Sequence, residues 1–447
     1  MQERIAGPKA RHPGKGRRRL RGLAVALGLL AAAPLGGCAL LRTGVSMLEA
    51  STPPPVALSL DDAVAGLTGA LIANAQLGLP NASGTYRTVV DPWIDRGTGE
   101  QSETTRAMET RIGELVRTRF PLVELLPFGT ESLAREPLIV IGAINAVAAP
   151  GSVEPVPEDR AGAYRIWGII GNLATGRVIS SEQAWARRED VTAAPAAIFR
   201  DSPTWMPDRA TEAYLRTSLA RKGDRIDPQY LAGLPATALL AEGTRAYEAG
   251  RYAEALDRFT GAERLPSGEQ PRTYNGIYLV SSALGRADAA EAAFGRLVDL
   301  GLDRGQVMVK FTFQPGSTNF WPDPVISGPY PMWIRQIAGR VAARNTCLLL
   351  RGHSSPSGSA TANERLSLAR AEALRRRIAQ EQPSLRSRLR AEGAGASEPI
   401  VGTGADNASD VLDRRVELRP VPCADVALGT LPGSGMPGSR MEERHIR

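Results

Sequence analysis

The sequence predicts an α+β protein built from several domains. With 447 residues, the chain is too long for one hydrophobic core. Apolar residues recur at both helical and strand spacing in the early and late parts of the chain, whereas the segment between them has helical spacing only. We therefore expect an N-terminal α+β domain at residues 57–228, helical hairpins at residues 236–302 and a C-terminal domain of β-α-β-α-β order at residues 306–423.

The first 37 residues have the features of a bacterial export signal. A positively charged run that ends at residues 17–21 precedes an apolar segment, residues 23–34, which is too short to span a membrane as a mature helix. Residues 35–38 read Leu-Gly-Gly-Cys and resemble a lipobox. There are two alternatives to a lipobox. The segment could be an ordinary signal peptide in which a cysteine happens to occur, or it could be an N-terminal membrane anchor.

The lipobox resemblance implies that Cys38 becomes the acylated first residue of the mature protein. Because Ala39 rather than Asp follows it, the resemblance also implies sorting to the outer membrane, with the protein on the periplasmic face. Residues 38–56 are small and end in a run of three prolines, so we expect a tether between the lipid anchor and the folded part.

Charge excludes one class of partner. Removal of the first 37 residues takes away a net charge of +7, which equals the formal charge of the whole chain, so the mature protein is neutral and its high pI does not indicate nucleic-acid binding. Residues 306–423 carry 16 Lys and Arg against 10 Asp and Glu. A basic domain suits an anionic wall polymer, although the Arg-rich usage is also compatible with a purely compositional origin.

The N-terminal domain is predicted from caps and periodicity. Ser59 caps a helix with Asp62 three positions later. A strand that ends before Asp91 and a second helix centred on Met108 follow, and the remaining strands are expected at residues 122–126, 138–148, 164–170 and 177–185. The order, together with the hairpin Asn-Leu-Ala-Thr-Gly-Arg-Val at residues 172–178, distantly resembles flagellar FlgO-type and curli-export lipoproteins.

The middle segment repeats itself. Gly285, Ala290 and Phe294 lie 35 positions after the equivalent residues Gly250, Ala255 and Phe259. This period resembles the tetratricopeptide repeat, in which small residues let two helices approach closely. Two generic Ala-rich hairpins are the alternative. In either case we expect a spacer or a docking surface for an unknown envelope protein.

Four motifs follow one another in the C-terminal domain. They are Gly-His-Ser-Ser-Pro-Ser-Gly at 352–358, Asn-Glu-Arg-Leu-Ser-Leu-Ala-Arg-Ala at 363–371, Gly-Ala-Gly-Ala-Ser-Glu-Pro at 393–399 and Asp-Arg-Arg-Val-Glu at 413–417. Their order and spacing resemble the OmpA-like family, which implies a β-α-β-α-β sandwich that binds peptidoglycan non-covalently.

The resemblance also implies a ligand site. In the family, an Asp of the first motif and an Arg of the second hold the zwitterionic diaminopimelate of the wall peptide, because an ammonium needs a carboxylate and a carboxylate suits a guanidinium. Arg370 occupies the Arg position, but Ser355 stands where the family has Asp, so we expect a weakened grip. Asn363 is expected to order the loop, and Arg415 either faces the pocket or pairs with Glu417.

The same resemblance implies a disulfide. The strand that begins at Cys347 and the strand before Cys423 run antiparallel side by side in the family, and once Cys38 is acylated these are the two remaining thiols in an oxidising compartment. After Cys423 the Gly-, Pro- and Ser-rich residues 424–447 have little to bury, so we expect a disordered tail.

An enzymatic function has little support in the sequence. His353 is the only histidine inside a predicted domain, which excludes a metal site built from several histidines. The motif around it is not a complete hydrolase elbow, because Pro356 stands where that motif needs Gly. Paired carboxylates for glycan cleavage remain open.

We expect neither catalysis nor a metal or other cofactor. The predicted function is that of a peptidoglycan-binding outer-membrane lipoprotein which docks a protein partner. The alternative is a component of an outer-membrane secretion or flagellar assembly that is anchored to the wall.

Overall fold

The computed structural model describes residues 55–314, 316–400 and 413–428. The predicted signal peptide, Cys38 and nearly all of the tether lie outside these residues. Within the described residues, no helix is both long and apolar enough to cross a membrane. The fold class predicted from the sequence, a mixed α+β chain of several parts, is confirmed.

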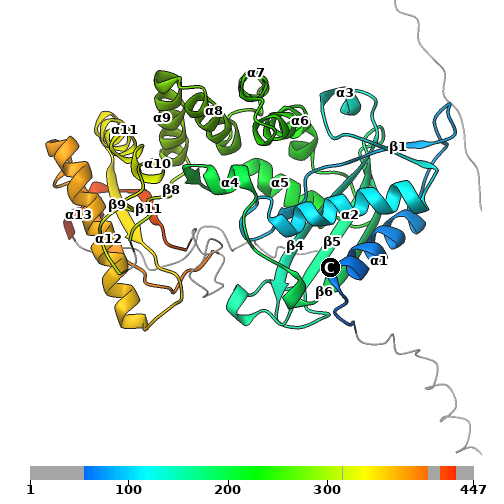
Figure 1. Ribbon diagram of the computed structural model, residues 1–447, viewed down its shortest axis with the longest axis horizontal. Helices are drawn as coiled ribbons and strands as arrows, with labels where there is room; N and C mark the ends of the chain where they lie inside the picture. Colours follow the sequence, from blue (N-terminus) through cyan, green and yellow to red (C-terminus); the bar gives the residue numbers. More distant parts are fainter. Residues whose placement is uncertain (1–54, 315, 401–412, 429–447) are drawn as a thin grey trace, which may run out of the picture. The chain divides into compact units, whose positions relative to one another are not determined.

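The N-terminal part is built on a mixed sheet in the order β3-β1-β4-β5-β6 (Figure 1). Its strands are β1 (Tyr86–Val90), β3 (Val123–Leu126), β4 (Leu138–Val147), β5 (Ala163–Asn172) and β6 (Arg177–Ala186), with the short β2 (Ile94–Asp95) paired to β4. β1 runs parallel to both of its neighbours, and β4, β5 and β6 are antiparallel. The helix and strand order predicted for this segment is therefore present, while its likeness to the FlgO-type and curli-export lipoproteins stays a prediction.

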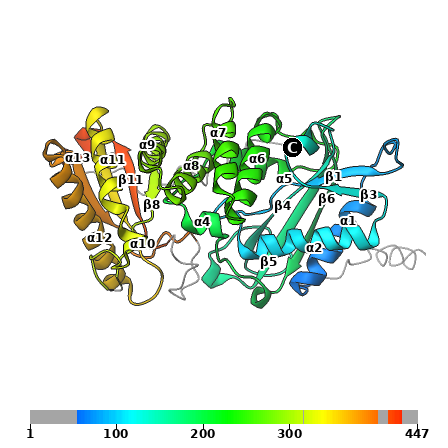
Figure 2. The same cartoon turned by 45° about the horizontal axis from the view of Figure 1, so that its top comes forward.

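Helices cover both faces of this sheet. α1 (Leu60–Ala73) and α2 (Glu103–Arg119) lie side by side over one face, and α5 (Arg209–Ser218) and the first turns of α6 (Pro228–Glu248) pack on the other (Figures 1 and 2). The predicted cap is confirmed, because the Ser59 side chain accepts a hydrogen bond from the backbone N–H of Asp62 at 3.1 Å. Shorter elements are α3 (Thr130–Leu133), α4 (Ala197–Asp201) and the 3₁₀ turns Glu158–Arg160, Arg188–Asp190 and Pro383–Leu385.

Two helical hairpins follow the N-terminal sheet. They consist of α6, α7 (Tyr252–Glu263), α8 (Pro271–Ala283) and α9 (Ala287–Asp303). Gly250 and Gly285 end equivalent helices with φ of 72° and 68°, which only glycine adopts without strain. The ring of Phe259 fills the seam between helices, where a β-carbon on Gly276 would lie 2.6 Å from it. The repeat in the sequence thus marks equivalent packing positions, while its assignment to the tetratricopeptide family stays a prediction.

The C-terminal sheet has the order β10-β9-β11-β8-β7. Its strands are β7 (Thr204–Trp205), β8 (Val307–Val309), β9 (Cys347–Gly352), β10 (Leu389–Gly393) and β11 (Val416–Val421). Its helices are α10 (Pro324–Ser327), α11 (Tyr330–Ala343), α12 (Ala360–Glu381) and α13 (Cys423–Leu428). α11 and α12 pack on one face through a core that also includes residues of β8, β9 and β11 (Figure 2).

That core does not stop at the C-terminal sheet. It continues into the helical hairpins, where the ring of Phe294 on α9 stacks on Trp333 of α11 with centroids 5.3 Å apart. The indole of Trp333 also donates a hydrogen bond to the hydroxyl of Tyr278 at 3.0 Å. The hairpins and the C-terminal sheet therefore share one hydrophobic interior.

Three local features differ from the sequence-based expectation. β10 and β7 are absent from that expectation: β10 pairs parallel to β9, and β7 adds residues from before the hairpins to the far edge of the sheet. The alternation of apolar and polar residues from Val307 to Phe313 predicts a strand over that range, but β8 ends at Val309, beyond which an isolated bridge pairs Phe313 with Phe320. The first residues of the predicted tail are helical, in α13, and residues 429–447 lie outside the described part.

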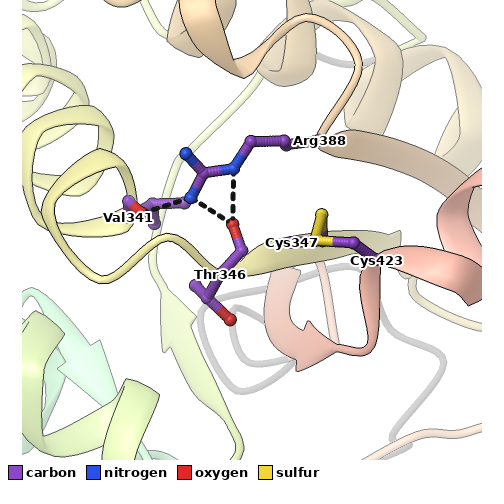
Figure 3. The surroundings of a disulfide bond; sticks show 5 residues. All are labelled: Val341, Thr346, Cys347, Arg388 and Cys423. Atoms are coloured by element: carbon purple, nitrogen blue, oxygen red, sulfur yellow. Dashed lines mark hydrogen bonds between the residues drawn. A yellow bond between two sulfur atoms is a disulfide. The ribbon is translucent and has the colours of Figure 1, made fainter.

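The predicted disulfide is confirmed. Cys347 at the start of β9 and Cys423 at the start of α13 are bonded, with Cα atoms 5.1 Å apart (Figure 3). Next to it, Arg388 donates hydrogen bonds to the carbonyls of Thr346 and Val341, at 2.9 Å from Nε and 2.7 Å from Nη2. The disulfide and the hydrogen bonds of Arg388 together fix the position of the first residues of β9.

Candidate functional site

The motif glycines bring α12 against the ends of β9 and β10. A β-carbon on Gly352 would collide with the carbonyl of Ser367, and one on Gly393 would lie 2.6 Å from the carbonyl of Glu364. Gly395 has φ of 57°, and its N–H donates a hydrogen bond to the Ser367 hydroxyl at 2.9 Å. These positions require glycine because a helix backbone contacts the strand ends directly. The result is a shelf formed by the loop after β9 and the first half of α12.

Ser355 and Asn363 lie together on this shelf. The Ser355 hydroxyl is 3.3 Å from that of Ser357, and the Asn363 amide donates to the Ser357 carbonyl at 2.9 Å. Both Ser355 and Asn363 are buried. The Asn363 amide therefore binds the loop after β9, and the Ser355 hydroxyl lies beside that of Ser357 in the same loop. The parts of both residues in a ligand site stay predictions.

Arg370 lies two turns further along α12, on its buried face. Only 4% of the residue is exposed. Its Nε and Nη2 donate to the carbonyls of Ser317 and Gln314 at 3.2 Å each, and its guanidinium lies 5.2 Å from the centroid of the Phe313 ring. Arg370 thus fastens the loop after β8 to α12, and its side chain is buried.

Arg415 belongs to a cluster of charges around Glu417. Its Nη2 lies 2.6 Å from the Glu417 carboxylate, whose other oxygen pairs with Arg419 at 2.5 Å, and His353 Nε2 lies 3.3 Å from the same group. Burial alone would raise the pKa of Glu417, but His353, Arg415 and Arg419 hold it below its usual range. Burial lowers the pKa of His353, so the ring is neutral near pH 7.

The structure brings some predicted site residues together and separates others. Ser355 and Asn363 share Ser357 as a partner, and Arg370 stands on the same helix as Asn363. Arg415 instead forms an ion pair with Glu417 on β11, which was one of its two expected placements. Its role in wall binding, like that of the other three residues, stays a prediction.

Sequence reasoning missed the loop at residues 314–320. This loop supplies both carbonyls that bind Arg370, and the guanidinium of Arg377 lies 4.3 Å from the centroid of its Phe320 ring. The sequence did contain a signal for this loop, because Gln-Pro-Gly-Ser-Thr-Asn at residues 314–319 is a turn-forming composition. In the part of the chain that the structure describes, no group of three or more His, Cys, Asp or Glu residues could hold a metal ion.

Comparison with known proteins agrees with the C-terminal geometry. Residues 312–411 match the model of the OmpA family, so this stretch is an OmpA-like domain. The match does not extend to the helical hairpins or to the N-terminal sheet. No curated protein sequence matches the chain.

Solved structures that are similar to this chain align over about a quarter of it. The peptidoglycan-associated lipoprotein from Burkholderia pseudomallei is 24% identical, with 25% of this chain and 88% of that chain covered and a TM-score of 0.22. The cell wall anchor of the T6SS from Pseudomonas aeruginosa is 25% identical, with 25% and 78% covered and a TM-score of 0.21. The periplasmic domain of Helicobacter pylori MotB is 15% identical, with 28% and 80% covered and a TM-score of 0.22.

Proposed function

We propose that this chain is an outer-membrane lipoprotein that binds peptidoglycan non-covalently and so links the envelope to the wall. The observation that carries the proposal is the OmpA-family match at residues 312–411, which contains Ser355, Asn363 and Arg370 on one shelf. Cys38 supplies the lipid anchor, and the helical hairpins dock an envelope protein. The protein acts by binding and not by catalysis.

The wall peptide would be held mainly through its carboxylate. The guanidinium of Arg370, which also donates to the carbonyls of Ser317 and Gln314, is the group that recognises this carboxylate in the proposal. The Ser355 hydroxyl can accept a hydrogen bond from an ammonium group but supplies no negative charge to it. Wall binding should therefore be weaker than in a domain that has a carboxylate at this position.

Binding to purified sacculi tests the proposal. The protein is prepared with Cys38→Ser so that it is soluble, and co-sedimentation is compared for the parent, Arg370→Ala and Ser355→Asp. Arg365→Ala is the matched control, because Arg365 is an exposed residue of the same helix. We expect Arg370→Ala to lose ~2 to 5 kcal/mol of binding free energy. Ser355→Asp should gain affinity, and Arg365→Ala should bind as the parent does.

Arg370 also binds the loop after β8, so Arg370→Ala could weaken binding by disturbing that loop. A second substitution at the same position is therefore needed. Arg370→Lys keeps a cation while losing the paired donors, and circular dichroism and melting temperature establish whether each variant is folded. The assignment of wall binding to this domain would be overturned if folded Arg370 variants co-sediment with sacculi as the parent does. It would also be overturned if the parent protein does not bind sacculi.

The lipid anchor is tested separately in cells. Cys38→Ser should release the protein from the outer-membrane fraction and remove the mass of the acyl chains. Unchanged fractionation and mass would contradict the anchor. Crosslinking in intact envelopes followed by pull-down, compared between the full protein and a variant with altered hairpin surface, identifies the docked protein.

A further inference from the structure

A cavity of about 340 Å³ lies at the carboxyl end of β1 in the N-terminal sheet, far along the chain from the wall-binding shelf. Its walls come from the loop after β1, from α2, α5 and α6, and from α8 of the second hairpin. Small-molecule sites have volumes of roughly 300–1,000 Å³, so this cavity suits a small ligand and not a folded segment. Its lining includes charged side chains of both signs.

Two carboxyl groups in the cavity form no ion pair among the residues that the structure describes. The Asp91 carboxyl accepts a hydrogen bond from the Tyr230 hydroxyl at 2.5 Å, and Glu109 accepts two through one oxygen, from the Trp93 N–H and the Gln101 amide at 2.7 Å each. Among the described residues, the second oxygen of each carboxyl accepts no hydrogen bond and neither carboxyl forms an ion pair. Asp91 is 1% exposed. Each carboxyl thus keeps one acceptor for a ligand.

One guanidinium in the same cavity also lacks an ionic partner. Arg106 pairs with Glu248 at 2.6 Å and Arg272 with Glu100 at 3.1 Å. Arg245, by contrast, donates only to the Phe128 carbonyl, at 2.8 Å, and forms no ion pair within the described part of the chain. In the described residues the cavity therefore has two acidic groups and one basic group with no ion pair between them, although the charge of Glu109 still favours the cationic form of Arg245 against burial.

We propose that this cavity binds a small zwitterion, an α-amino acid or a dipeptide, with its ammonium group at Asp91 and Glu109 and its carboxylate at Arg245. The ammonium group of such a ligand can bind the two carboxyl groups while its carboxylate binds the guanidinium. Charge-assisted hydrogen bonds of this kind are among the strongest. A metal ion fits less well, because the described residues contain no group of three metal-ligating side chains. The inference does not depend on wall binding.

The acidity of the two carboxyl groups adds a second signature. Burial raises the pKa of Asp91 to about 7, against the Tyr230 hydrogen bond and the charge of Arg272. Burial raises the pKa of Glu109 to about 8, with Asp91 adding to it and Arg106 and hydrogen bonds opposing it. An ammonium group favours the ionised form of both, so binding at pH 7 should release protons.

Calorimetry on the Cys38→Ser protein tests the proposal. The probes are the twenty common amino acids and their alanyl dipeptides, each binder being compared with its decarboxylated amine, for example L-lysine with cadaverine. We expect at least one probe with a Kd below 1 mM, at least tenfold weaker binding by the amine, and proton release at pH 7 that vanishes by pH 9. Proton release is obtained by repeating the titration in buffers of different ionisation enthalpy.

Three isosteric or near-isosteric variants locate the site. Asp91→Asn and Glu109→Gln should each weaken binding at least tenfold, and Arg245→Gln should weaken the binding of the amino acid while leaving that of the amine unchanged. Asp61→Asn, which removes an exposed carboxylate of α1, is the control and should bind normally. Folding is checked by melting temperature. The proposal fails if no probe binds the parent, if the amine binds as tightly as the amino acid, or if folded Asp91 and Glu109 variants bind as the parent does.

Discussion

Glu417 in the C-terminal sheet and Asp91 in the N-terminal cavity are both carboxyl groups with 1% of their residue exposed. Glu417 lies between two arginines and is held ionised. Asp91 has a tyrosine hydroxyl for its partner and a pKa raised to about 7. Two equally buried carboxyl groups therefore have pKa values shifted in opposite directions. The direction of the pKa shift depends on whether pairing with a positive charge outweighs the loss of hydration.

Buried charged groups have different roles in the C-terminal domain and in the N-terminal cavity. In the C-terminal domain the charges near the motif residues are paired with one another, and Arg370 is bound to backbone carbonyls, so they stabilise the local structure around the shelf. In the cavity Asp91, Glu109 and Arg245 form no ion pair within the described residues, and burial raises the pKa of the two carboxyl groups, which is common at binding sites. Four measurements would sharpen or break this contrast.

The largest effect is expected from the disulfide. The bond closes a loop with a sequence separation of 76 residues, so its reduction should lower the free energy of unfolding by ~4 to 5 kcal/mol. Hydrogen exchange with and without reductant should show faster exchange of β9 and β11 and unchanged exchange of β4 and β5. Equal loss of protection in both sheets would show that the two regions are not independent.

Removal of a paired charge should have the next largest effect. Glu417→Gln leaves Arg415 and Arg419 without their shared carboxylate and should lower the free energy of unfolding by ~3 kcal/mol at pH 7. The folded pKa of Glu417 lies below its unfolded value, so its contribution is present above the unfolded pKa and is lost as the pH falls. Denaturant titrations at pH 7 and pH 3 should show the difference between parent and variant shrinking at the lower pH.

The cavity carboxyls should show the opposite dependence on pH. Asp91 has a folded pKa above its unfolded value, so the folded state binds the proton more tightly and stability falls as the pH rises from about 4 to about 7. Between pH 5 and pH 7 the parent should lose up to ~1.4 kcal/mol per pH unit relative to Asp91→Asn. Parallel stability curves for the two proteins would contradict the raised pKa.

The smallest effect tests the uncharged seam between these regions. Gly276→Ala places a β-carbon 2.6 Å from the Phe259 ring and should lower the free energy of unfolding by ~1.5 kcal/mol at any pH between 5 and 8. Gly233→Ala is the matched control on a neighbouring helix, because no atom lies within 4 Å of its β-carbon, and it should gain ~0.5 to 1 kcal/mol. Destabilisation of both variants alike would mean that the seam is not specifically packed.

Much of the fold was predictable because its signals are local. The cap of α1, the strands of the N-terminal sheet, the hairpin helices and β9, α12 and β11 follow from apolar spacing and turn residues within short windows. The disulfide was also an expectation, because the resemblance to the OmpA-like family implies that the strands next to the two cysteines lie side by side. Of the candidate site, the order of the four motifs placed Ser355, Asn363 and Arg370 on neighbouring elements.

The remainder depends on contacts between distant parts of the chain. β7 joins a sheet whose next strand is about a hundred residues later, and a two-residue strand leaves no periodic trace. The choice of Arg415 between the pocket and Glu417 depended on how the residues just before β11 approach that strand, which the pairing of β11 with β9 determines.

The sequence by itself determined the identity and order of the elements and the chemistry available at the motif, because helix caps, apolar periods and turn residues act within a few residues of one another. Only the tertiary structure decided which buried charges meet. Asp91, Glu109 and Arg245 come from three separate elements, and the burial that raises the pKa of the two carboxyl groups exists only after α2, α6 and α8 have closed around them. Burial and pairing are properties of the assembled fold, so the contrast between Glu417 and Asp91 is invisible in the residues alone.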